Sequence, residues 1–146
     1  MDKTFVDLAS FARFVLTLPA QEKMADVFAR LEAAHHIKHE LQARIGDASK
    51  LPPPLADATQ AQRVRDGFSA DETLKRTGAF HDSIQVVEES PRVTLIATDD
   101  EKAIYHELGT PRVPKRAPFA RTMTDENEKA FALYAAAFGR IFGSRA

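Results

Sequence analysis

Residues 83–98 decide the fold class, and they read Ser-Ile-Gln-Val-Val-Glu-Glu-Ser-Pro-Arg-Val-Thr-Leu-Ile-Ala-Thr. Apolar side chains recur at every second position on both sides of Ser90-Pro91, and Ser-Pro is a turn signal. The pattern predicts a β-hairpin whose strands cover residues 83–87 and 93–98. Asp99-Asp100 makes the next turn, and residues 103–108 fit either a third strand or a short helical turn that Gly109 ends.

Upstream of the hairpin, apolar residues recur at spacings of three and four, which is the period of one helical face. The first such run starts at Phe5 and ends near Leu16, so it predicts a short helix. Pro19 is expected to open a second helix, because proline is tolerated in the first turn. This second helix runs to Gly46, a typical C-terminal stop.

The remaining segments predict a long connection and a closing helix. In residues 47–76, Pro52-Pro53-Pro54 enforces extended backbone and only residues 56–65 have a weak helical pattern. Thr124 is expected to cap the last helix, with acidic residues near its positive N-terminal end. Its apolar face is predicted to cover the sheet, and consists of Phe131, Tyr134, Ala135, Phe138 and Phe142.

Helices at both ends and strands grouped between them predict an α+β fold rather than alternating α/β. We expect a single domain over residues 1–146, with a helical part (1–46), a long loop (47–76), a sheet with a basic loop (77–121) and a C-terminal helix (122–146). With about three strands, one sheet edge stays unpaired, and such an edge invites another subunit.

Composition excludes several classes of protein. The 146 residues are 44% hydrophobic and 28% charged, and there is no Cys, so disulfides, thiol nucleophiles and thiolate metal ligands are excluded. The formal net charge of −1 argues against a free-standing nucleic-acid binder. The apolar stretches are shorter than the roughly 18 residues of a membrane span. We therefore expect a soluble protein without a membrane partner, made in the cytoplasm from Met1.

The search for chemistry gives one candidate that remains open. His35 and His39 lie one turn apart on the second helix, beside Glu32, His36 and Glu40, and could share a metal. They lack the H-E-x-x-H order and a third ligand. We therefore predict no catalytic residue, metal or cofactor, and keep a small metal-dependent enzyme that uses His35 and His39 as the alternative.

Two other polar groups resemble catalytic sets only by their letters. His81-Asp82-Ser83 has the residues of a hydrolase triad, but neighbours on a strand point to opposite faces, so they are expected to be polar residues at a strand start. His106-Glu107 beside Tyr105 would need a cleft and a second convergent group to act as an acid–base pair. Both are interpreted as ordinary polar positions.

Charge is separated along the second half of the chain. Residues 82–107 hold seven acids and two bases, a regional charge of −5, whereas residues 108–121 hold four bases and no acid. Solvation alone would explain either segment. The functional interpretation is that the basic loop of one copy meets the acidic hairpin of the next in a head-to-tail ring. The predicted interface residues are Arg112, Lys115, Arg116, Phe119 and Arg121.

Prolines at 111, 114 and 118 stiffen this basic loop, which lowers the entropy that docking costs. Phe119 is expected to be an aromatic anchor among the arginines. A contact with nucleic acid is the weaker interpretation of the loop, because no further aromatic residues alternate with its basic residues.

Two segments resemble a known family. Leu74-Lys75-Arg76-Thr77-Gly78-Ala79-Phe80-His81-Asp82-Ser83-Ile84 is similar to the "L-x-R-T-G-x-L-x-x-S-I" segment of tail-completion and head-tail joining proteins of tailed bacteriophages. Tyr105-His106-Glu107-Leu108-Gly109-Thr110, followed by Pro114 and Ala117-Pro118-Phe119, resembles their "Y-x-x-E-F-G-T … P-x-R-P-F" segment. The two segments occur in the family's order, and the match covers residues 74–121.

The resemblance implies a non-enzymatic structural protein of the virion neck. Such a protein forms a ring, expected to be a hexamer, that joins the DNA-filled head to the tail and lets DNA pass. Its partners would be connector or stopper proteins and tail terminator or tail tube proteins. The particle would be a phage, a defective prophage or a gene-transfer agent. Acidic side chains that face the lumen would repel the passing DNA, and the candidates are Glu88, Glu89, Asp99, Asp100 and Glu101.

Overall fold

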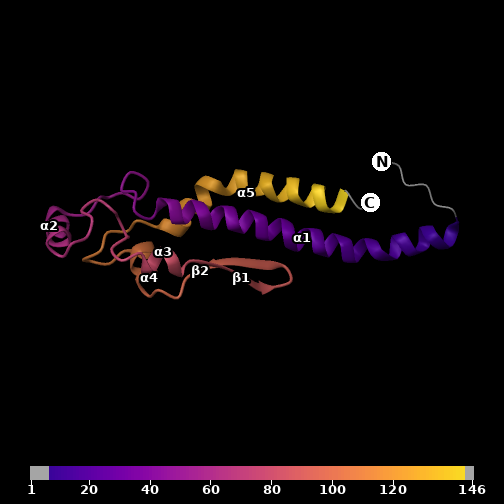
Figure 1. The fold of residues 1–146 in the computed structure, drawn as a ribbon, viewed down its shortest axis with the longest axis horizontal. Coiled ribbons are helices and arrows are strands. Elements are labelled where there is room, and N and C mark those ends of the chain that lie inside the picture. The colour runs from indigo at the N-terminus through magenta and orange to yellow at the C-terminus, as the bar shows by residue number, and fades with distance from the viewer. Residues whose placement is uncertain (1–6, 144–146) are drawn as a thin grey trace.

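The structure, a computed structural model, describes residues 7–143, so Phe5 and the last residues of the predicted C-terminal helix lie outside the described part. The fold is α+β, as the sequence predicts (Figure 1). Its elements in chain order are α1 (Leu8–Arg44), α2 (Asp57–Arg65), α3 (Ala79–Ser83), β1 (Gln85–Ser90), β2 (Val93–Ala97), α4 (Lys102–Leu108) and α5 (Pro118–Gly143).

The two predicted N-terminal helices are one continuous helix, α1, with Pro19 inside it. The prediction that Pro19 separates two helices is therefore wrong. A proline inside a helix removes one hydrogen bond, but Pro19 is exposed, so water can reach the freed carbonyl. At the helix start, the Asp7 carboxylate accepts the Ser10 N–H at 2.6 Å, which completes a capping box.

The C-terminal helix also begins earlier than predicted. It starts at Pro118, and Thr124 lies inside it and donates to the Ala120 carbonyl at 2.9 Å, so Thr124 is not the cap. The prolines of the basic loop were expected to stiffen a loop, whereas Pro118 occupies the first helical position that proline favours. The cap comes instead from Glu107, whose carboxylate accepts the N–H groups of Phe119 and Ala120 at 3.0 and 2.9 Å.

Helix α5 packs along α1, and α1 is the helix that contacts both strands of the hairpin. Figure 1 shows α5 and the hairpin on opposite sides of α1. The prediction that the last helix covers the sheet is thus wrong. Polar contacts join the two long helices, since Arg44 pairs with Asp125 and Glu126 and the Tyr134 hydroxyl donates to Asp26 at 2.8 Å.

The hairpin is confirmed as two antiparallel strands, in which Val86 pairs with Ile96 and Val87 with Leu95. Residues 103–108, which fitted either a strand or a helical turn, form the helix α4. The expected sheet of about three strands therefore has two. Each strand has one open edge within the described chain, so the structure contains two unpaired strand edges instead of one.

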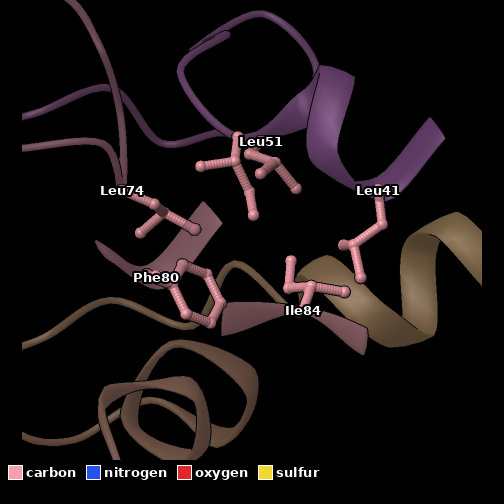
Figure 2. Packing of buried hydrophobic residues seen from close by; sticks show 6 residues of the cluster. Leu41, Leu51, Leu74, Phe80 and Ile84 are labelled. Atoms are coloured by element: carbon pink, nitrogen blue, oxygen red, sulfur yellow. The ribbon is translucent and has the colours of Figure 1, made fainter. Parts of the chain in front are cut away.

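The core lies at the C-terminal end of α1, where the short helices gather (Figure 1). Its buried side chains come from α1, from the 47–76 segment and from α3, together with the residues that directly follow α1 and α3: Leu41, Ile45, Leu51, Leu74, Phe80 and Ile84. Figure 2 shows how Leu41, Leu51, Leu74, Phe80 and Ile84 point toward one another. Leu51 is fully buried and Leu74 is 8% exposed. Both ends of the long connection are therefore held by the core, and the segment between them contains α2.

Candidate functional site

The first part of α1 exposes large apolar side chains. Figure 1 shows α1 running well past the C-terminal end of α5, so this part of α1 projects from the fold. Leu8 is 81% exposed and Leu16 78%, and Val15 is exposed as well. Spacings of seven and eight residues place these three on one helix face. Single exposed leucines are ordinary, but a group on a projecting helix is typical of an interaction surface.

A second apolar surface lies on the outer face of the hairpin. The inner face carries Val86 and Ile96, which are half-buried, and Ile96 packs against the core. The cross-strand neighbours Val87 and Leu95 point the opposite way and are about 40% exposed (41% and 39%). An exposed apolar sheet face with unpaired edges can accept another chain.

Three of the predicted basic residues are available to a partner. Arg112, Lys115 and Arg121 are exposed, and none of them forms an ion pair within residues 7–143. Exposed cations without a local carboxylate can contact an acidic surface of another molecule without breaking an internal pair.

Arg116 and Phe119 are not available, which corrects the sequence prediction. Arg116 is 3% exposed, and its guanidinium donates to the main-chain carbonyls of Pro53 at 2.9 Å and Pro54 at 3.3 Å. Phe119 is half-buried and packs against the core. The basic loop returns over the proline segment of the long connection, so these two side chains stabilise the monomer.

The predicted acidic residues form two separate groups. Glu88 and Glu89 lie near the turn of the hairpin, whereas Asp99 and Glu101 follow β2 at the other end, and all four are exposed. Glu88 pairs with Thr94 near the turn, whereas Asp99 follows Ala97, the last residue of β2, so the two groups lie toward opposite ends of the hairpin. Asp100 differs from the others, because its carboxylate accepts the Lys102 N–H at 2.9 Å where α4 begins.

The two family-like segments meet in the structure. The Phe80 ring lies 6.0 Å from the His106 ring, and the His106 carbonyl accepts the N–H groups of Arg116 and Ala117. Gly109 has a φ of +79°, and a Cβ there would meet the Lys115 backbone at 3.0 Å. The residues that the two segments share with the family therefore have a structural role: they hold α3, α4 and the start of α5 together.

The histidine pair on α1 is exposed to solvent. The His39 side chain is 80% exposed and lies 3.7 Å from the Glu40 carboxylate. Two residues near this pair join α1 to α5 instead: His36 forms a hydrogen bond with Glu126 at 3.1 Å, and Glu32 accepts one from Arg140 at 2.6 Å. Across residues 7–143, no three His, Asp or Glu side chains converge as a metal site would require.

The triad-like segment lies in α3 and not on a strand, which corrects the placement predicted for it. His81 and Asp82 interact, with 2.7 Å between Nδ1 and Oδ1, although neighbours on the predicted strand would point to opposite faces. The Ser83 hydroxyl donates to the Phe80 carbonyl at 2.8 Å and bonds the Thr98 hydroxyl. It has no bond to His81, so the three do not form a nucleophile–base pair.

Within the described chain, no helix combines the length and apolarity that crossing a membrane requires. Comparison of the chain with models of protein families, with curated proteins and with solved structures gives no match.

Proposed function

We propose that the chain is a structural assembly protein of the neck of a tailed bacteriophage or a related particle, where copies form a ring that joins head to tail. The observation that carries the proposal is the projecting, apolar first part of α1, whose Leu8 and Leu16 remain about 80% exposed in the monomer (81% and 78%). A ring subunit must keep such a surface for its neighbours. The resemblance of residues 74–121 to head-tail joining proteins supplies the identity of the assembly.

The occupant that we propose for these surfaces is a second copy of the chain. The exposed Arg112, Lys115 and Arg121 complement the exposed carboxylates of the hairpin, and the two sets lie on different segments. A contact between two different patches is heterologous, and it closes into a ring when the rotation between copies permits. We expect a hexamer, in contact with connector or stopper proteins on one side and tail terminator or tail tube proteins on the other.

The two separate groups of acidic residues allow two roles in a ring through which DNA passes. One group can pair with the basic loop of the neighbour while the other faces the lumen, where negative charge would keep the phosphate backbone from binding. Glu88 and Glu89 form the first group, and Asp99 and Glu101 form the second. No catalytic step is part of this function.

Self-association of the full chain tests the proposal, with sedimentation velocity and native mass spectrometry at low salt. Replacing Arg112, Lys115 and Arg121 together by Gln is expected to weaken association at least about tenfold, since several charge pairs are lost. The matched control replaces Lys50, Arg65 and Lys129, three exposed cations elsewhere, by Gln. Equal loss in both triple variants would indicate a net-charge effect and would contradict the interface.

The apolar surface has its own pair of variants. Leu8→Gln with Leu16→Gln keeps helix propensity but removes exposed apolar area, so association is expected to fall while the unfolding temperature stays unchanged. Val64→Gln on α2, where Val64 is 61% exposed, is the control. A wild-type chain that stays monomeric up to millimolar concentration at low salt would sink the ring proposal.

The metal-enzyme alternative predicts a different result. Chain purified without chelator would then hold a stoichiometric metal that His35→Ala with His39→Ala removes. Under the assembly proposal this double variant leaves both metal content and self-association as in the wild type. Elemental analysis of the two proteins distinguishes the two functions.

A further inference from the structure

A second candidate site lies at the junction of the two motif segments, which both contribute to its lining. It is a pocket of about 260 Å³ whose polar lining is mainly cationic, with Arg63, Arg76, Lys102, His106 and Arg116. The described lining residues include no Asp or Glu. The volume is below the roughly 300 to 1,000 Å³ of sites for drug-sized molecules, so the pocket suits one small group.

Two of the cations are held in place by main-chain carbonyls instead of carboxylates. Arg116, almost fully buried, donates to Pro53 and Pro54, and Arg63, half-buried, donates through Nη1 to the Glu72 carbonyl at 2.6 Å. Burial lowers the pKa of Arg116, and the charge of Arg63 lowers it further. Such bonds fix the direction of a guanidinium but do not neutralise its positive charge, which is costly for a buried group. Arg63 has the Glu72 carboxylate nearby, whereas no carboxylate acts on Arg116 among the described residues.

The other cations line the same pocket. Arg76 is paired with Asp66 at 2.9 Å and lies over the Phe68 ring, whereas Lys102 is exposed and has no ion pair within the described chain. The Nδ1 atom of His106 is buried and has no hydrogen-bond partner there. Burial lowers the pKa of His106, and the charge of Arg116 lowers it further.

We propose that this pocket binds a phosphate group, either free phosphate or a phosphate of a nucleic-acid backbone. Four cationic side chains line it: Arg63, Arg76, Lys102 and Arg116. Three carboxylates act on the group from outside the lining, Asp66 on Arg76, Glu72 on Arg63 and Asp100 on His106, and none of them lines the pocket itself. A phosphate group has at least two terminal oxygens in a tetrahedral arrangement, so it can accept from several of these cations at once, whether it is free or part of a phosphodiester. The guanidinium fork, fixed in direction by the carbonyls, matches phosphate oxygens, and Lys102 adds a point charge at the surface.

NMR and calorimetry on the full chain test the pocket, with inorganic phosphate as the probe and chloride at equal ionic strength as the blank. Phosphate is expected to raise the pKa of His106, because a bound anion offsets the cations around the ring. Arg63→Gln should weaken phosphate binding at least about tenfold. Lys102→Gln, a surface change that leaves the core intact, should weaken it about two- to fivefold.

Lys50→Gln and Lys129→Gln remove exposed cations outside both the pocket lining and the proposed interface, so each should bind phosphate as the wild type does. A short DNA duplex that competes with phosphate and moves the same His106 signal identifies a backbone phosphate as the source, and a duplex without effect identifies free phosphate. The proposal is overturned if phosphate leaves His106 unmoved over the millimolar range. It is overturned equally if acetate moves His106 and phosphate does not, or if the control variants lose binding as Arg63→Gln does.

Discussion

Replacing Glu107 by Ala removes the cap of α5. The carboxylate of this half-buried residue accepts two main-chain N–H groups, those of Phe119 and Ala120, so the variant leaves both donors without a partner at the helix start. Losing one capping bond costs about 0.5 to 2 kcal/mol, and the charge at the positive helix end adds about 0.3 to 1 kcal/mol. Water can replace part of this at a half-buried site, so we expect a loss of about 2 kcal/mol.

The assay is urea unfolding followed by circular dichroism, with a thermal scan beside it. A loss of about 2 kcal/mol corresponds to a fall of about 4 to 8 °C in the unfolding temperature of a chain of this size. Glu107→Gln keeps one acceptor oxygen and should lose about half as much. Glu89→Ala, at an exposed hairpin position, is the control and should lie within about 0.5 kcal/mol of the wild type. A Glu107→Ala variant as stable as this control would refute the capping role.

Two further predictions concern the long helices. The hydrogen bond from His36, and then that from Arg44, lowers the pKa of Glu126, so its contribution to stability is present above the ordinary value of 4.5 and is lost as the pH falls through the lowered value in the folded state. In Glu126→Gln, the urea midpoint of unfolding should therefore fall less steeply as the pH drops below 4.5 than it does in the wild type. The same pH dependence in both proteins would contradict this role of Glu126. Pro19→Ala should stabilise the chain by about 1 to 3 kcal/mol, because it restores a helical bond at an exposed position, and a lower urea midpoint would show that the proline is needed.

Local patterns were predicted well where neighbouring residues decide the structure. The hairpin follows from alternation on both sides of a turn, and its strands are where the sequence places them to within a few residues. Gly109 ends the segment before it, as expected, and has a positive φ. The α+β class follows from these local elements and their order.

Packing partners could not be predicted in the same way. The apolar face of α5 indicates that something covers it, but the periodicity does not say whether a sheet or a helix does. A proline usually breaks or ends a helix, so the sequence predicts a break at Pro19. The helix α1 continues because Pro19 is exposed, and water can reach the carbonyl that loses its hydrogen bond. The start of α5 depends on Glu107, which lies in a different helix.

The candidate interface was predicted in part. Arg112, Lys115 and Arg121 are exposed as expected, whereas Arg116 is buried against two carbonyls more than 60 residues away (62 and 63). A charged side chain is usually solvated, so no pattern in the sequence marks Arg116 as an exception. The exposure of Leu8 and Leu16 was not predicted, because spacings of three and four residues indicate one helical face but do not say what covers it.

Particles induced from the strain that encodes this chain provide the most direct test of its proposed role in a neck. Electron microscopy with an antibody against the chain should show label at the junction of head and tail. Deleting its gene should leave filled heads and separate tails that do not join. Normal, infectious or DNA-transferring particles from the deletion strain, with the chain absent from wild-type particles, would contradict the proposal.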